Sequence, residues 1–191
     1  MAIKRTPIIR RGLDAGPRGS GPFVKIPPDT RVELIVLKSL EDGLVAINNH
    51  TLWVKGGWSP SFPCIGDDCP GCELGNDATY KGFLPVYVPA EKRSLVFSFG
   101  TRVATQLFDL EKEVGEEGET LKGRVIRVRR SGSGRETSYS LVMIDKKFKV
   151  AKISLPDIDA AIGPTTRAEI LKTIKKSGFS PKRSRDEDEA E

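Results

Sequence analysis

Residues 120–144, TLKGRVIRVRRSGSGRETSYSLVMI, contain two runs that alternate between apolar and polar side chains, joined by SGSG. Alternation of this kind is typical of strands with one buried face, and a glycine-rich tip between two such runs predicts a hairpin. In the first run, Ile126 and Val128 share one face, while Arg127 and Arg129 share the other with Val125. The stretch therefore predicts a sheet whose exposed face carries arginines.

Further strands are expected between residues 30 and 100. Residues 30–55 read as strand, turn and strand, with EDG as the turn signal. Residues 80–89 and 94–100 read as a second pair, in which Pro85 and Pro89 should limit the first run to a sheet edge or a bulge. Residues 56–78 are too rich in Gly, Pro and Asp for regular structure.

Two helices and a last short strand complete the expected elements. Residues 101–114 place Val103, Leu107, Leu110 and Val114 at helical spacing, with Thr101 as the N-cap. Residues 165–178 form an amphipathic helix that ends at Gly178, and residues 147–155 should add a short strand. The fold class expected is mainly β: an oligonucleotide-binding (OB) barrel of about five antiparallel strands, one helix after the fourth strand and a C-terminal helix. Mixed α+β and sandwich arrangements remain open.

Composition and charge bound the domain organisation. The chain of 191 residues carries a net charge of +5, and its length suits one domain with tails. We expect a basic flexible arm over 1–28, a core over 29–155, a helical segment over 156–179 and a disordered acidic tail over 180–191. The tail carries Asp186, Glu187, Asp188, Glu189 and Glu191. A basic arm at one end and an acidic tail at the other are typical of chains that bind polyanions, and such charge runs are also found in tails that are only solvated.

The only histidine and all three cysteines lie within 23 residues: His50, Cys64, Cys69 and Cys72. No apolar run is long enough for a membrane span and no secretory signal is evident, so we expect an intracellular, reducing compartment rather than disulfides. CPGC is a knuckle that aims two sulfurs at one point, and Cys3His is a usual closed zinc set. The spacing predicts one structural zinc ion within a subdomain at 50–80 that has little core of its own, with Asp67 or Asp68 as the substitute for His50.

Aromatic and cationic residues interleave around this loop and along the later hairpin, which is what a single strand of nucleic acid requires. The stacking candidates are Trp53, Trp58, Tyr80, Tyr87 and Tyr139. The phosphate-binding candidates are Lys55, Lys81, Arg102, Arg124, Arg127, Arg129, Arg130 and Arg135. We expect Phe97, Phe99 and Phe108 to be core residues.

The order of these features resembles the zinc-containing single-stranded DNA-binding proteins of tailed phages (helix-destabilising protein type) over roughly residues 30–150. PCIGDDCPGC (63–72) is the most specific piece, followed by FGTRVATQLFDL (99–110). The resemblance implies an OB fold with an inserted zinc subdomain, the four zinc ligands named above, and a basic aromatic cleft without sequence preference. It also implies self-association along DNA through a basic segment matched by Lys4, Arg5 and Thr6, and recruitment of replication or recombination proteins by the acidic tail.

The function expected from the sequence is therefore a non-enzymatic protein that coats single-stranded DNA during phage DNA replication, recombination and repair, in the cytoplasm of an infected bacterium. The alternative is a zinc-knuckle adaptor that binds a protein of a transcription or replication complex. An enzyme is disfavoured because the lone histidine is used by the metal and no carboxylate cluster stands out.

Overall fold

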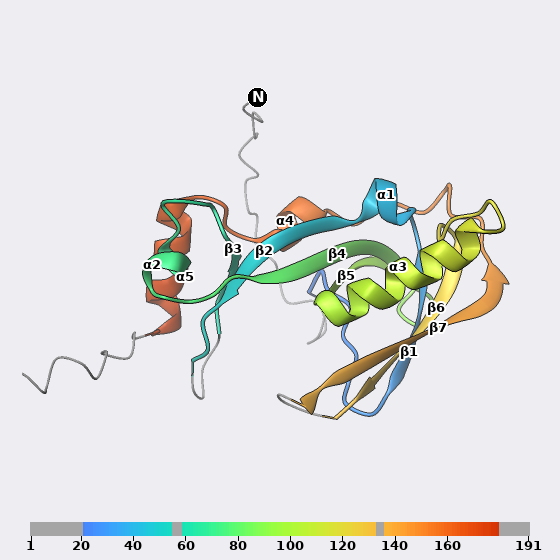
Figure 1. Ribbon diagram of the computed structural model, residues 1–191, viewed down its shortest axis with the longest axis horizontal. Helices are drawn as coiled ribbons and strands as arrows, with labels where there is room; N and C mark the ends of the chain where they lie inside the picture. Colours follow the sequence, from blue (N-terminus) through green and yellow to red (C-terminus); the bar gives the residue numbers. More distant parts are fainter. Residues whose placement is uncertain (1–20, 55–58, 133–135, 180–191) are drawn as a thin grey trace, which may run out of the picture.

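The computed structural model describes residues 21–54, 59–132 and 136–179, in an elongated arrangement (Figure 1). Seven strands form one sheet in the order β3-β2-β4-β1-β6-β7, with β5 paired to β4. The strands are β1 (Arg31–Val36), β2 (Val45–Thr51), β3 (Ser61–Pro63), β4 (Thr79–Val88), β5 (Arg93–Phe99), β6 (Arg124–Ser131) and β7 (Ser138–Lys147). The helices are α1 (Leu40–Gly43), α2 (Pro70–Glu73), α3 (Thr101–Gly115), α4 (Ile158–Ile162) and α5 (Arg167–Ser177). All strand pairs between these elements are antiparallel. The fold is therefore mainly β, as predicted, with one antiparallel sheet and a few helices.

Strand β4 lies in the interior of the sheet, so the prediction that its prolines confine it to an edge or a bulge is wrong. One edge of β4 pairs with β5, and the other pairs first with β2 and then with β1. Pro85 falls between the part paired with β2 and the part paired with β1. Its carbonyl accepts a hydrogen bond from the Leu37 amide at 3.1 Å, just beyond the end of β1. The missing proline N–H therefore falls where the neighbouring strand has already ended, and it costs the sheet no ladder bond.

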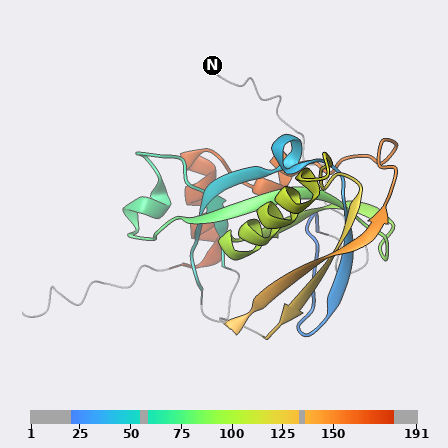
Figure 2. The same ribbon diagram turned by 45° about the vertical axis from the view of Figure 1, so that its right-hand side comes forward.

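The main core lies between the sheet and α3. Buried residues of α3 pack against apolar side chains from β1, β4, β5 and β6, and the helix crosses this face of the sheet (Figures 1 and 2). The predicted helix is confirmed, but its N-cap is Gly100 rather than Thr101. Phe97 and Phe99 are buried as expected, whereas Phe108 is 51% exposed. Phe108 follows the buried Leu107 by one residue, about 100° around the helix, and so lies at the side of the buried face rather than at its centre.

The sheet is open within the described part of the chain, and a closed barrel is not shown. Residues 22–24 run along the edge of β5 that does not pair with β4. The Val24 amide donates to the Val96 carbonyl at 3.0 Å, and the Val96 amide donates to the Pro22 carbonyl at 2.8 Å. On β7, the Gln106 side chain of α3 donates to the Tyr139 carbonyl and accepts from the Leu141 amide, at 3.1 and 3.0 Å. Each of the two edges that a barrel would join thus makes two hydrogen bonds to other groups.

The remaining segments differ in part from the predictions. The hairpin of β6 and β7 is confirmed, and α5 ends at Gly178 in a left-handed conformation (φ 70°), as expected. Residues 148–157 contain no strand, because Val150 packs instead on the face opposite α3 with Ile35, Leu37 and Val125. The stretch 56–78 does contain regular structure, namely β3 and α2. Most of the basic arm and all of the acidic tail lie outside the described residues.

Candidate metal centre and basic surface

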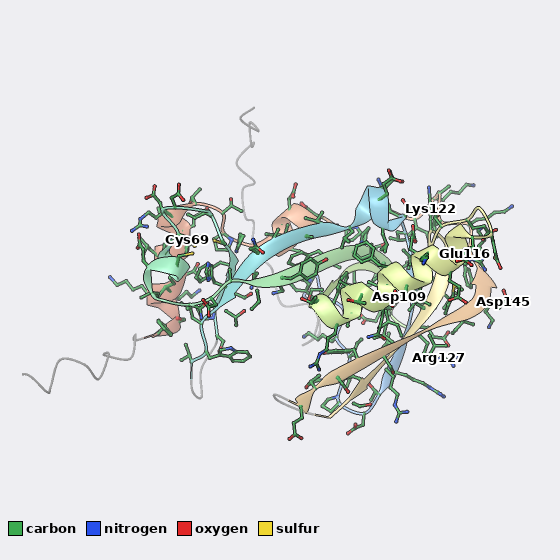
Figure 3. The ribbon with its side chains drawn as sticks, in the orientation of Figure 1. Cys69, Asp109, Glu116, Lys122, Arg127 and Asp145 are labelled. Carbon is green, nitrogen blue, oxygen red and sulfur yellow. The ribbon has the colours of Figure 1, made fainter. Side chains whose placement is uncertain are left out.

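Four side chains from β2, the end of β3 and α2 converge at one end of the molecule. His50 lies near the end of β2, Cys64 directly follows β3, Cys69 is the N-cap of α2, and Cys72 lies within α2. Pairing of His50 with Phe62 across β2 and β3 brings the histidine close to Cys64. Figure 3 shows Cys69 in this lobe, far from α3.

The ligand atoms of His50, Cys64, Cys69 and Cys72 all lie within 4.8 Å of one another. The Sγ atoms of Cys64 and Cys72 are 3.7 Å apart, and Cys72 Sγ lies 3.5 Å from His50 Nε2. A tetrahedral ion with metal–sulfur bonds of about 2.3 Å and a metal–nitrogen bond of about 2.05 Å has edges of about 3.8 and 3.6 Å. These two distances match the edges of such a tetrahedron, and the four residues could hold a metal ion in which His50 rather than Asp67 or Asp68 completes the set.

A second layer of contacts orients the histidine ring. His50 Nδ1 lies 3.2 Å from Asn76 Oδ1, so the protonated Nδ1 donates and Nε2 is left to face the sulfurs. Asn76 is itself held by a hydrogen bond from its Nδ2 to the Thr51 carbonyl at 3.3 Å. A Cβ atom on Gly71 would lie 2.5 Å from His50 Cγ, so only glycine fits between the knuckle and the ring. Sequence reasoning missed Asn76, because no local spacing links it to His50.

The thiols of this lobe differ in acidity. Burial raises the pKa of Cys69, but backbone amides of Ile65, Cys72 and Gly71 donate to its sulfur and bring the pKa down to about 7. The hydrogen bond with Cys64, then burial and neighbouring thiolates, raise the pKa of Cys72 to about 11. Without a cation, full deprotonation of the cluster is therefore opposed, and a divalent ion at its centre would reverse this preference.

The apolar contacts of the metal-binding loop are completed by a distant segment of the chain, so the loop shares a small core rather than having one of its own. Leu52, Phe62 and Ile170 are fully buried together, and Ile65 and Leu74 among others pack around them. Ile170 belongs to α5, about 100 residues away in sequence, which is why the loop read in isolation lacks a core.

Three of the predicted phosphate-binding cations are already engaged. Lys81 Nζ donates to Ser61 Oγ at 3.0 Å and lies 5.7 Å from the centroid of the Phe83 ring, and burial lowers the pKa of this lysine. The Arg124 side chain is 12% exposed and forms a salt bridge with Glu119, in the segment after α3. Arg127, labelled in Figure 3, pairs with Glu33 of β1 at 2.7 Å.

Other cations are open to solvent. Arg102 is exposed in the first turn of α3. Arg129 is exposed and lies directly opposite Arg31 across β6 and β1, beside a hollow of about 550 Å³ that is also lined by Asp29 and Thr30. Arg130 is half-buried, with Nη1 donating to the Ile26 carbonyl at 3.0 Å. Arg31 was missed as a site residue, because its position opposite Arg129 depends on a strand register that the sequence does not reveal.

The aromatic candidates lie on different surfaces. Trp53, beyond the end of β2, is 81% exposed, and Tyr139 of β7 is 37% exposed beside a small apolar pocket near the start of α3. Tyr80 is half-buried against the main core, where burial raises its pKa. Tyr87 packs on the opposite face of the sheet. Lys55, Trp58 and Arg135 lie outside the described residues.

The predicted nucleic-acid contacts that the structure describes therefore lie in separate regions of the molecule. Arg31, Arg129, Arg130 and Tyr139 gather at the tip end of β1, β6 and β7, because Arg130 lies opposite Tyr139 just as Arg129 lies opposite Arg31. Trp53 belongs to the metal lobe. The structure does not bring Lys81, Tyr87 and Arg124 to this end of the hairpin.

Comparisons with protein-family models, with characterised proteins and with solved structures gave no significant match. Among the described residues, no helix has the length and apolar character needed to cross a bilayer.

Proposed function

We propose that this protein binds single-stranded DNA without sequence preference and without catalysis, through arginines at the tip end of β1, β6 and β7. The observation that supports this best is the Arg31–Arg129 pair. Like charges directly opposite one another in a sheet are destabilising. The neighbouring cross-strand pair on the same face, Glu33 and Arg127, is compensated by a salt bridge. Within the described part of the chain, neither Arg31 nor Arg129 forms a salt bridge, although, after the larger effect of Arg127, the charge of Arg31 contributes to lowering the pKa of Glu33.

An anion from outside the chain would supply the missing compensation. Arg102 and Arg130 add two further cations on the α3 face of this end of the sheet, the face opposite to the one that carries Arg31 and Arg129, so a strand of nucleic acid that passes around this end meets cations on both faces. The nearest described carboxylate in the hollow, Asp29, is engaged by the Gly132 amide at 3.3 Å. A polyanion at this end thus meets four cations and one carboxylate, that of Asp29, which lines the hollow.

Exposed aromatic rings favour a single strand over a duplex. Bases of single strands stack on aromatic side chains for about 1–3 kcal/mol each, regardless of sequence. Tyr139 adjoins the arginines, and Trp53 projects from the metal lobe. At 81% exposure the Trp53 ring is accessible for a base to stack on it.

The metal in this proposal is zinc, and its role is structural. Three cysteines and one histidine form a closed set of four protein ligands, which leaves no coordination position for a water nucleophile. The order of β5, β4, β1, β6 and β7, with α3 across one face, fits an OB arrangement left open between β5 and β7. The resemblance to phage proteins then suggests work in phage DNA replication, recombination and repair within the bacterial cytoplasm, with replication proteins as partners of the tail.

Titration with poly(dT) at two salt concentrations tests the proposal. We expect tryptophan emission to be quenched on binding, and log affinity to fall with log salt at a slope of about −2.8, from four cations at about −0.7 each. The variant W53F should retain binding and salt dependence but lose most of the quenching if Trp53 stacks on bases. Absence of binding, with unchanged emission, would contradict the proposal and favour the protein-adaptor alternative.

A further inference from the structure

The C-terminal helix α5 packs on the metal lobe, away from the main sheet core. Ile170 at its centre is fully buried between Leu52 and Phe62, and Ile174 and Phe179 pack around the same cluster. Helix α5 contacts α2, and Figure 1 shows the two helices together at the end of the molecule away from α3. Helix α5 and the metal-binding loop therefore share one small core.

The partners of Ile170 are also the residues that hold the histidine ligand. Phe62 lies opposite His50 in the β2–β3 pairing, and the two rings are 5.8 Å apart between centroids. Leu52 follows His50 by two residues and is 1% exposed. Removing α5 would expose the apolar wall against which the imidazole is fixed.

A polar clamp joins α5 to the knuckle from outside. Arg167 Nη1 and Nη2 reach the two carboxylate oxygens of Glu73 at 2.6 and 2.9 Å, and Nη1 also donates to the Asp68 carbonyl at 2.6 Å. Asp68 and Glu73 are the sequence neighbours of Cys69 and Cys72. One guanidinium thus spans the two ends of the CPGC turn, and bidentate pairs of this kind fix geometry as well as charge.

We infer that the docking of α5 is coupled to metal binding by His50, Cys64, Cys69 and Cys72, so that each of the two favours the other. Arg167 acts as a positioning residue that holds the knuckle in its ligating geometry without touching the ion. Because coupling between two binding equilibria is reciprocal, metal loss must weaken the docking of α5 to the same extent that α5 strengthens metal binding.

Cobalt binding by the full-length protein tests the first half of the coupling. Co²⁺ absorption reports tetrahedral thiolate ligation, and competition with a chelator gives the affinity. The variant R167Q should bind Co²⁺ about 10-fold more weakly, as is usual when a supporting contact is lost, with the spectrum of the wild type because the four ligands remain. The variant R93Q is the matched control, because it breaks the half-exposed Arg93–Glu91 pair far from the metal lobe. Equal Co²⁺ affinity of R167Q, R93Q and wild type would overturn the inference, as would absence of the thiolate spectrum from the wild type.

Proteolysis tests the second half and does not depend on DNA binding. Trypsin sites at Lys172, Lys175 and Lys176 lie within α5. We expect these sites to resist cleavage in the metal-loaded protein, and to be cut early after chelation while the β6–β7 hairpin stays protected. In I170A the same sites should be cut early even with metal bound. Cleavage of α5 that is equally slow with and without metal would contradict the coupling, whatever the outcome of the poly(dT) titration.

Discussion

Replacing the Arg31–Arg129 pair by glutamine should weaken DNA binding without destabilising the fold. In the double variant R31Q/R129Q, two unpaired charges are removed from adjacent strands, and both glutamines can occupy the same exposed positions. Because the wild-type pair brings like charges together, its removal should leave the free energy of unfolding unchanged or raise it by about 0.2–1 kcal/mol.

The expected change in salt dependence follows from counting free cations. Arg31, Arg102, Arg129 and Arg130 give a wild-type slope of about −2.8 in log affinity against log salt, and the double variant should show about −1.4, since each phosphate contact contributes about −0.7. Between 50 and 200 mM salt, affinity for poly(dT) would then fall about 50-fold in the wild type and about 7-fold in the variant. Fluorescence titration over this range measures both slopes.

A neutral change on the same face supplies the control. The variant E33Q/R127Q removes one carboxylate and one guanidinium that already neutralise each other at 2.7 Å, so its slope should match the wild type. If R31Q/R129Q and E33Q/R127Q reduce the slope equally, the distinction between free and paired arginines is wrong. If R31Q/R129Q keeps the full slope, phosphates are bound elsewhere.

Three further changes test the metal lobe and the core. N76A should lower Co²⁺ affinity about 10- to 100-fold in chelator competition, because His50 loses the acceptor that fixes its ring. G71A should lower both Co²⁺ affinity and the melting temperature, since its Cβ would lie 2.5 Å from the His50 ring, whereas G115A, with open space around it, should do neither. L107A should reduce the free energy of unfolding by about 2–5 kcal/mol in urea titration, through a cavity under α3.

The metal centre was predictable because its information is local. Four rare donors lie within 23 residues, and a CxxC turn fixes two of them by itself. The β6–β7 hairpin was predictable for the same reason, since strand alternation and a glycine-rich tip need no distant partner. Helix α3 likewise shows its buried face in the spacing of its own apolar residues.

What the sequence could not reveal depends on long-range packing. Arg127 and Arg129 are equivalent in an alternating strand, and only the register with β1 places a carboxylate opposite the first and an arginine opposite the second. Lys81 looks like a surface cation until β3 supplies Ser61 beside it. The exposure of Phe108 and the burial of Ile170 follow from the neighbours that each helix meets, and a single helix pattern does not contain those neighbours.

Strand β4 connects the metal lobe to β1, the strand on which Arg31 lies. Thr79 at its start pairs with Asn49, beside the ligand His50, while Tyr87 near its end pairs with Ile35 of the strand that begins at Arg31. Strand β4 does not reach Arg31, which lies at the opposite end of β1 from Ile35 and Val36, so the metal lobe with Trp53 and the arginine end of the hairpin belong to different strands of the sheet. Loss of metal should therefore disturb the contribution of the metal lobe to DNA affinity and leave the cation count, and with it the salt slope, unchanged. Under the proposed function, zinc would fix the position of the Trp53 ring, and the arginines would determine how strongly binding responds to salt.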